Sequence, residues 1–162
     1  NLELASKNPP FEISSGDFPI YTRARFLPPT RMDGATINNS LIADGCQIES
    51  GAVIENSIIG LRCRIGEGVQ IRNSVIMGAD FYEGVESSAS NVSQQRLPLG
   101  IGPNTVIDGA IIDKNARIGR GVQITNPGNI ETSEESPQCM IRDGIIVIPR
   151  ETELPDGWQL KA

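Results

Sequence analysis

Residues 42–76 read IADGCQIESGAVIENSIIGLRCRIGEGVQIRNSVI, and their isoleucines return at intervals of six, six and five residues. Three intervals add up to 17 residues, so Ile42 has a counterpart in Ile59 and Ile48 has one in Ile65. Neither a helix nor a simple hairpin has this period. A repeat of this length predicts one coil of a three-sided parallel β-helix, with β-branched residues facing inward and glycines at the corners.

The repeat stops twice and resumes. Residues 79–98 are polar and serine-rich, and residues 125–140 are polar and acidic, so each is predicted to be a loop that leaves the coils. The coils continue between and after these loops, with isoleucines spaced six, five, six and six over residues 101–124 and a last strand pair over 141–148. We therefore expect an all-β solenoid of about five to six coils with two excursion loops.

The first 35 residues have no lasting periodicity. Residues 1–7 are predicted to be the tail of a helix, which Pro9 and Pro10 end, and the rest of the segment is predicted to be an extended linker leading into the coils. Residues 36–162 form the predicted β-helix domain. Because the chain begins with Asn1 and not Met, we expect a processed or truncated product.

Composition excludes several classes of function. The net charge of −6 disfavours nucleic-acid binding, and no apolar run is long enough to span a membrane. Three cysteines without CxxC spacing suit a reducing compartment, where each is expected to be a small packing residue. Histidine is absent, which excludes the histidine-dependent acyltransferases and zinc carbonic anhydrases built on similar repeats. We predict no catalytic residue and no metal ligand.

Three basic clusters remain as candidates for an anion site. Arg23 and Arg25 lie two residues apart in a segment predicted to be extended, and would share a face. Lys114 lies at a predicted corner, and Arg150 follows the last strand. Converging Arg and Lys side chains would bind phosphate, although solvated surface charge or a salt bridge is the commoner explanation for each such residue. Gly100 and Gly102 fall in the repeat and are predicted to be part of the coils, not of a nucleotide-binding loop.

Five runs of sequence resemble, in the same order, the C-terminal domain of ADP-glucose pyrophosphorylases (glucose-1-phosphate adenylyltransferases) of the cyanobacterial and plant type. The runs are PIYTRARFLPP (19–29), SIIGLR (57–62), MGADFYE (77–83), GIG (100–102) and AIIDKNARIG (110–119). The resemblance covers residues 1–157, and MGADFYE and IIDKNARIG are its specific motifs. It implies a left-handed β-helix.

In that family a separate nucleotidyltransferase domain makes ADP-glucose and diphosphate from ATP and glucose 1-phosphate with Mg²⁺. The resemblance implies that this chain lacks the catalytic domain, needs no cofactor of its own and is inactive alone. It implies a tetramer activated by 3-phosphoglycerate and inhibited by phosphate, in the bacterial cytoplasm or the plastid stroma. The solenoid side of the effector site would consist of Arg23, Arg25, Asp113, Lys114 and Arg150, where Arg150 replaces a family lysine. A further basic position of the family is Pro127 here.

Two functions follow as hypotheses. The chain is the regulatory and oligomerisation domain of such an enzyme, binding phosphate-type effectors and contacting its own nucleotidyltransferase domain or other subunits. Alternatively, it is a non-catalytic β-helix subunit recruited into a larger assembly. The altered basic position and the serine-rich first loop mildly favour this alternative.

Overall fold

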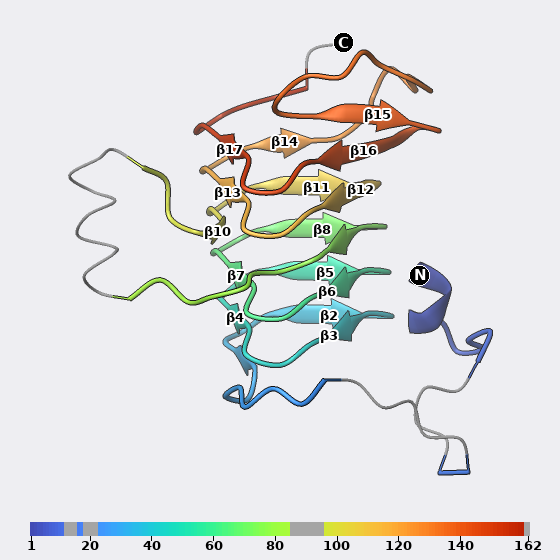
Figure 1. Ribbon diagram of the computed structural model, residues 1–162, viewed down its shortest axis with the longest axis vertical. Helices are drawn as coiled ribbons and strands as arrows, with labels where there is room; N and C mark the ends of the chain where they lie inside the picture. The colour runs from blue at the N-terminus through green and yellow to red at the C-terminus, as the bar shows by residue number, and fades with distance from the viewer. Residues whose placement is uncertain (12–15, 18–22, 85–95, 161–162) are drawn as a thin grey trace.

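The chain winds into a three-sided parallel β-helix in a computed structural model that describes residues 1–11, 16–17, 23–84 and 96–160 (Figure 1). Sheet A contains β1 (Arg31–Met32), β4 (Gln47–Ile48), β7 (Arg64–Ile65), β10 (Gly100–Ile101), β13 (Arg117–Ile118) and β17 (Glu153–Leu154). Sheet B contains β2 (Thr36–Asn38), β5 (Val53–Glu55), β8 (Gln70–Arg72), β11 (Val106–Asp108) and β14 (Gln123–Ile124). Sheet C contains β3 (Leu41–Ile42), β6 (Ile58–Ile59), β9 (Val75–Ile76), β12 (Ala110–Ile112), β16 (Ile145–Ile148) and β15 (Met140–Arg142).

The 17-residue repeat sets the register of the strands in each sheet. Ile48 pairs with Ile65, Ile54 with Ile71, and Ile59 with Ile76. The register survives the first excursion, because Ile65 of β7 pairs directly with Ile101 of β10. The strands complete five coils, and β17 with the bridge from Gln123 to Gln159 begins a sixth, which confirms the predicted number.

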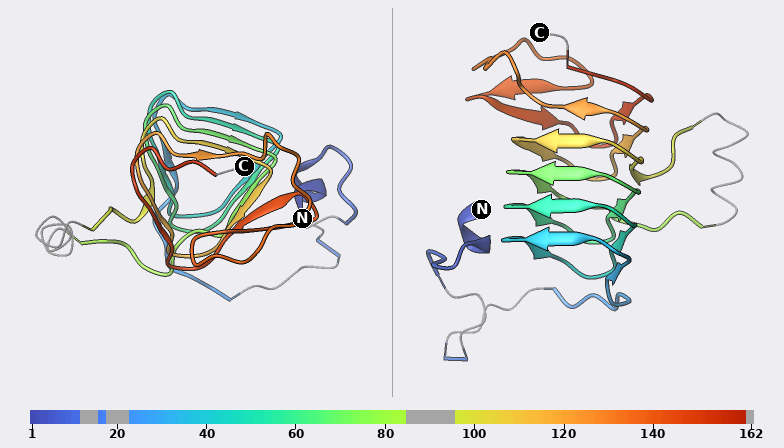
Figure 2. Two further views of the ribbon diagram at one scale, coloured as in Figure 1. Left: turned by 90° about the horizontal axis from the view of Figure 1, so that it is seen from above. Right: turned by 180° about the vertical axis from the view of Figure 1, so that it is seen from behind.

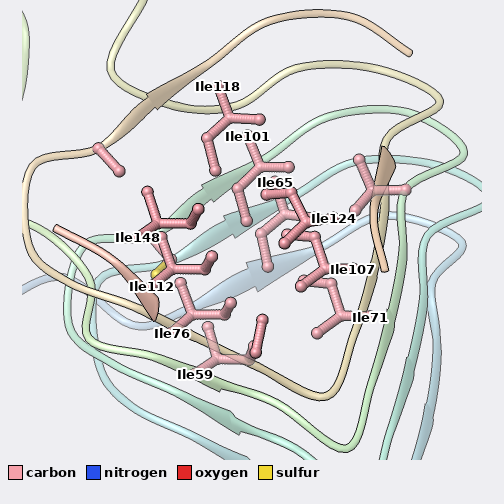
Figure 3. Packing of buried hydrophobic residues seen from close by; sticks show 14 of the residues in the cluster. Ile59, Ile65, Ile71, Ile76, Ile101, Ile107, Ile112, Ile118, Ile124 and Ile148 are labelled. Atoms are coloured by element: carbon pink, nitrogen blue, oxygen red, sulfur yellow. The ribbon is translucent and has the colours of Figure 1, made fainter. Parts of the chain in front are cut away.

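Isoleucine columns fill the interior of the coils (Figure 3). The side chains of Ile54, Ile65, Ile71, Ile107 and Ile124 are completely buried. Burial of one such side chain stabilises the fold by about 1.5–3 kcal/mol, so the columns supply most of the driving force for stacking. The prediction that the repeat isoleucines face inward is confirmed.

Polar ladders run along the corner between sheets B and C, which we call the B/C corner. Asn39, Asn56 and Asn73 occupy it in successive coils with φ of 45°, 45° and 48°, a left-handed conformation that asparagine tolerates. Their amides are joined in series, since Asn39 Nδ2 donates to Asn56 Oδ1 at 3.3 Å and Asn56 Nδ2 donates to Asn73 Oδ1 at 2.8 Å. Inside them Ser57 and Ser74 are completely buried, and the hydroxyl of Ser57 accepts the N–H of Ser74. The B/C corner of the first three coils is therefore held by asparagines, whereas Gly51 and Gly68 of the repeat turn the corner between sheets A and B.

The last strand pair is an antiparallel hairpin, not another pair of parallel strands. Met140 pairs with Val147, and Asp143 and Gly144 form the turn with φ of 50° and 75°. Two successive positive φ values are typical of the tight hairpin turn that Asp-Gly favours. β16 also pairs in parallel with β12, so the hairpin adds β15 to the edge of sheet C. Loop and tail residues that pack on the core cover this end of the solenoid, namely Ile130, Cys139, Trp158 and Leu160.

The N-terminal segment differs from its prediction in two respects. The predicted helix tail is a single 3₁₀ turn, η1 (Leu2–Ala5), and β1 lies within the segment predicted to be a linker. β1 pairs with β4 from Arg31 to Gln47, so the coils begin at residue 31. In the described ranges, no helix has the length and apolarity needed to cross a lipid bilayer.

The first excursion leaves the solenoid at the corner between sheets C and A, which we call the C/A corner. Seen from above, the coils form a triangle, and the described ends of the excursion leave it at one vertex (Figure 2). Residues 79–84 and 96–98 of the predicted loop 79–98 contain no helix or strand, and residues 85–95 lie outside the described part. The two ends of the excursion therefore meet the coils beside the candidate cations described next.

Candidate functional site

The C/A corner brings Lys114 and Arg150 into adjacent coils. Backbone hydrogen bonds stack its turns in order: Arg62 N–H to Asp44 O at 3.2 Å, Ala79 N–H to Leu61 O at 2.8 Å, Asn115 N–H to Gly78 O at 3.1 Å and Glu151 N–H to Lys114 O at 3.0 Å. Each turn needs a left-handed residue, and Asn115 and Glu151 take that position with φ of 62° and 61°. The two basic side chains, 36 residues apart in sequence, are thereby neighbours in space.

Both cations bind the same carboxylate, that of Asp80. Lys114 Nζ donates to Asp80 Oδ1 at 2.8 Å, and Arg150 Nη2 donates to Asp80 Oδ2 at 2.6 Å. The side chains of Lys114, Asp80 and Arg150 are 35, 36 and 52% exposed. Ion pairs with this exposure contribute only ~0.2–1 kcal/mol each. The cluster is therefore a pair of cations bound to one carboxylate of the chain itself, through weak and partly exposed ion pairs.

Asn115 fixes the position of Asp80 through a reciprocal pair of hydrogen bonds. The Asp80 N–H donates to Asn115 Oδ1 at 2.9 Å, and Asn115 Nδ2 donates to Asp80 Oδ2 at 3.1 Å. Asn115 is only 4% exposed, so its packing holds it in place and it can position the more exposed aspartate. The hydrogen bond from Lys114 is the main cause that lowers the pKa of the Asp80 carboxyl. Desolvation opposes it, and the hydrogen bond from Asn115 and the charges of Lys114 and Arg150 add to the lowering.

Two other acids balance the charge of the corner. Glu151 Oε1 lies 3.4 Å from Arg150 Nε, so Arg150 has two acidic partners. Asp113 was predicted to be part of the site, and its Oδ1 instead accepts the backbone N–H of Lys114 at 2.6 Å. Asp113 therefore holds the turn that carries Lys114, and the corner has no excess of positive charge.

Arg23 and Arg25 are not brought to Lys114 and Arg150. Both are exposed, and neither forms an ion pair with a described residue. Leu27 lies against Gly45 in the lowest turn of the C/A corner, three turns below Lys114. At about 4.8 Å per coil, roughly 14 Å along the helix axis separates that lowest turn from the turn of Lys114. Pro127 follows β14 at the B/C corner, away from the cluster.

A buried ion pair anchors the other side of the excursion. Arg117 Nη1 lies 2.5 Å from Glu83 Oε1, and the two side chains are 6 and 9% exposed. Glu83 Oε2 also accepts the N–H of Leu99 at 2.8 Å, and the Arg117 guanidinium donates to the carbonyl of Leu97. Both ends of the excursion are thus tied to one guanidinium on sheet A.

Tyr82 forms a third attachment, further down the C/A corner. Its hydroxyl donates to the carbonyl of Gly45 at 2.9 Å, and its ring lies 5.8 Å from the guanidinium carbon of Arg62. A Cβ at Gly45 would overlap the Tyr82 hydroxyl, and the φ of 77° also favours glycine there. A cavity of ≈ 280 Å³ lies beside Tyr82 and Arg62, and neither Lys114 nor Arg150 lines it.

Sequence reasoning missed Asp80, Glu83 and Arg117. The available signal was the MGADFYE run, which places two acids directly where the 17-residue repeat stops. The three cysteines behave as predicted: Cys46 and Cys63 are buried, and Cys139 is half-buried. Hydrogen bonding to Cys46 and burial raise the pKa of the Cys63 thiol. Within the described ranges, no three Cys, Asp or Glu side chains are placed to hold a metal ion.

One family model matches the chain over residues 25–158, and it is described as the GLGC left-handed parallel β-helix domain. The matched range begins at Arg25 and includes every strand of the solenoid. The match confirms the left-handed β-helix and the ADP-glucose pyrophosphorylase family that the sequence motifs indicated.

Proposed function

The chain belongs to the family of GLGC left-handed parallel β-helix domains, the C-terminal domains of ADP-glucose pyrophosphorylases, and from this premise we propose that it is a regulatory and oligomerisation domain. In this proposal it contributes to a site for phosphate-bearing effectors such as 3-phosphoglycerate and inorganic phosphate. The enzyme it regulates converts ATP and glucose 1-phosphate into ADP-glucose and diphosphate in glycogen or starch synthesis. That chemistry, with its Mg²⁺, belongs to a nucleotidyltransferase domain and not to the β-helix.

The convergence of Lys114 and Arg150 on one carboxylate carries the proposal. Two cations from adjacent coils hold their donors within 2.8 Å of the two oxygens of one carboxylate, an arrangement that also suits two oxygens of a phosphate. Effector binding at this corner would influence the nucleotidyltransferase domain through their interface, as a coupling free energy between two sites. We place the enzyme in the bacterial cytoplasm or plastid stroma, as a homo- or hetero-oligomer.

The outer face of sheet C supports the oligomerisation part of the proposal. Five outward-facing aliphatic side chains lie in register up the sheet: Leu41, Ile58, Val75, Ile111 and Val147. The corresponding positions of sheet B are mostly polar, with Thr36, Gln70 and Gln123 among them. A continuous apolar row on one face suits burial against another domain or subunit.

Calorimetric titration with inorganic phosphate and with 3-phosphoglycerate tests the effector site. We expect Lys114→Ala to weaken binding of both ligands by about tenfold or more, because one charge-assisted hydrogen bond is lost. Lys7→Ala is the matched control, because Lys7 is an exposed lysine of the N-terminal segment and its loss should leave both affinities unchanged. Equal affinities in the wild type and Lys114→Ala would reject the site.

A structural role is the second candidate function, and the balanced charge of the C/A corner favours it. Asp80 and Glu151 neutralise Lys114 and Arg150, which leaves no surplus charge to attract an anion. The chain would then be a non-catalytic β-helix subunit of a larger assembly. Determination of the native mass distinguishes the two: a 17.4 kDa chain within a complex, without phosphate binding, supports the structural role.

A further inference from the structure

The place where a phosphate would bind Lys114 and Arg150 is occupied by a residue of the first excursion. Asp80 offers one carboxylate oxygen to each cation, at 2.8 and 2.6 Å, and these are normal distances for charge-assisted hydrogen bonds. A phosphate dianion that used the same two donors would meet the Asp80 carboxylate at the same point. Two anions cannot share this position, since like charges repel strongly at contact distance.

Asp80 also lies at the boundary between the fixed and the projecting parts of the chain. The preceding residue, Ala79, is 6% exposed and is the last residue of this turn to join the backbone stack, through its hydrogen bond to Leu61. From Asp80 to Tyr82 the chain is exposed. The side chain of Asp80 can therefore leave the two cations without disturbing a strand of the solenoid.

The next fixed point is Tyr82, whose hydroxyl donates to the carbonyl of Gly45, and the ion pair of Glu83 and Arg117 follows it. That ion pair is buried, whereas the pairs of Asp80 are more than one third exposed. Of the two ion-paired attachments, that of Asp80 is accordingly the one that solvent and dissolved anions can reach. Release of Asp80 would free residues 80 and 81 while the attachments of Tyr82 and Glu83 hold.

We propose that Asp80 is an internal competitor of the phosphate-bearing effector: its carboxylate closes the site between Lys114 and Arg150, and the effector binds by displacing it. This inference rests on the proposed effector site. Binding of the effector should then be detectable as a movement of residues 80 and 81 away from Asn115. Because a phosphate dianion carries more charge than one carboxylate, it can replace Asp80, whereas a weakly charged anion cannot.

Removal of the competing charge should tighten binding. In Asp80→Asn the side chain keeps its size and loses its charge, so the site between the cations is open. If the open form of the wild type is populated at about one tenth, its apparent affinity is reduced about tenfold. Calorimetric titration with inorganic phosphate is therefore expected to give a dissociation constant about tenfold lower for Asp80→Asn than for the wild type.

Glu151→Gln is the matched control. It removes one carboxylate from Arg150 without touching Lys114, and Glu151 is 65% exposed. We expect its phosphate affinity to stay within about twofold of the wild type, because a screened, exposed charge has a small effect. An equal gain in phosphate affinity in both variants would show that loss of any negative charge at this corner strengthens binding. That result would overturn the specific role of Asp80.

Nuclear magnetic resonance gives a readout other than affinity. Phosphate added to the wild type should shift the backbone amide signal of Asp80 and the side-chain amide signals of Asn115, because their mutual hydrogen bonds break. The same signals in Lys114→Ala should not respond to phosphate. Phosphate binding that leaves both signals unchanged would overturn the displacement.

The variants also separate this inference from the function on which it rests. Binding that Lys114→Ala abolishes, with equal affinities in Asp80→Asn and the wild type, rejects the competitor and keeps the effector site. Absence of phosphate binding in the wild type and in Asp80→Asn rejects the effector site, and the competitor with it.

Discussion

Glu83 and Arg117, which are 34 residues apart in sequence, form the most buried ion pair among the described residues. Glu83 leaves the solenoid with the first excursion, while Arg117 belongs to β13 of sheet A. Since Arg117 also donates to the carbonyl of Leu97, one side chain fixes both ends of the excursion. The coils and the projecting loop are therefore coupled through a single guanidinium.

Loss of the Glu83 carboxylate should be costly. We expect Glu83→Gln to lower the free energy of unfolding by about 3 kcal/mol, because the buried Arg117 would then have only the more exposed Glu153, 3.8 Å away, to compensate its charge. Chemical denaturation measures the change. The control is Glu55→Gln: Glu55 lies 2.9 Å from Arg72 with both side chains about 40% exposed, and its loss should cost under ~1 kcal/mol. Similar losses in both variants would contradict the importance of burial here.

The isoleucine columns should be far more sensitive than the outer faces of the sheets. Ile107 is completely buried, so we expect Ile107→Ala to cost about 2–5 kcal/mol through lost burial and a remaining cavity. Ile111 lies in the neighbouring strand and faces outward, so the same substitution there should cost the isolated chain about 1 kcal/mol or less. Denaturant titration of the two variants under identical conditions gives the comparison. A larger loss for Ile111→Ala would mean that the outer face is covered in solution.

Two substitutions in the asparagine ladder separate the effect of backbone conformation from the effect of the side-chain hydrogen bonds. Asn56→Ala should cost about 1–3 kcal/mol, because alanine disfavours the φ of 45° and both amide hydrogen bonds are lost. Asn56→Gly loses the same hydrogen bonds and keeps the conformation, so its cost should be lower by about 1 kcal/mol. Thermal denaturation distinguishes the variants. Equal melting temperatures would show that the side-chain ladder alone holds the corner.

Acid should remove the contribution of Asp80 to stability. Because the pKa of Asp80 is lowered from its ordinary 3.8 in the folded chain, its ion pairs stabilise the native state above that pH. The stabilisation is lost as the pH falls through the folded-state pKa. The melting temperature of the wild type should therefore exceed that of Asp80→Asn by a constant amount from neutral pH to about pH 5, and the difference should shrink below pH 3.8. A difference that stays constant into strong acid would show that Asp80 acts without its charge.

The coils could be predicted because one period governs all of them. Spacings of six, six and five place an isoleucine such as Ile54 above Ile71 whatever the neighbouring residues are. The same reasoning identified Lys114 as a corner residue. The hairpin was harder: Asp143 and Gly144 are typical of a tight turn, but the strand pair was read as a continuation of the coils and its antiparallel direction was not foreseen.

The ion pairs of the site could not be predicted, because they join residues on either side of the first excursion, where the 17-residue repeat is interrupted. Asp80 contacts Lys114 and Arg150 only because the chain returns from the excursion in register, and that return is fixed by Glu83, Arg117 and the pairing of Ile65 with Ile101. The separations of 34 and 70 residues follow from the length of the excursion and not from the repeat. The arginines at 23 and 25 precede the first coil, so the 17-residue repeat could not place them.

β15 has a consequence for self-association. A stack of parallel coils offers unpaired strand edges at both ends, and such edges could join chains end to end into fibres. At the C-terminal end, β15 runs opposite to its neighbour β16, so the outermost edge of sheet C points the wrong way to continue a coil of an identical chain. This reversal interrupts one of the three sheets that a growing fibre would have to extend. It thereby favours assemblies of finite size over unlimited polymers.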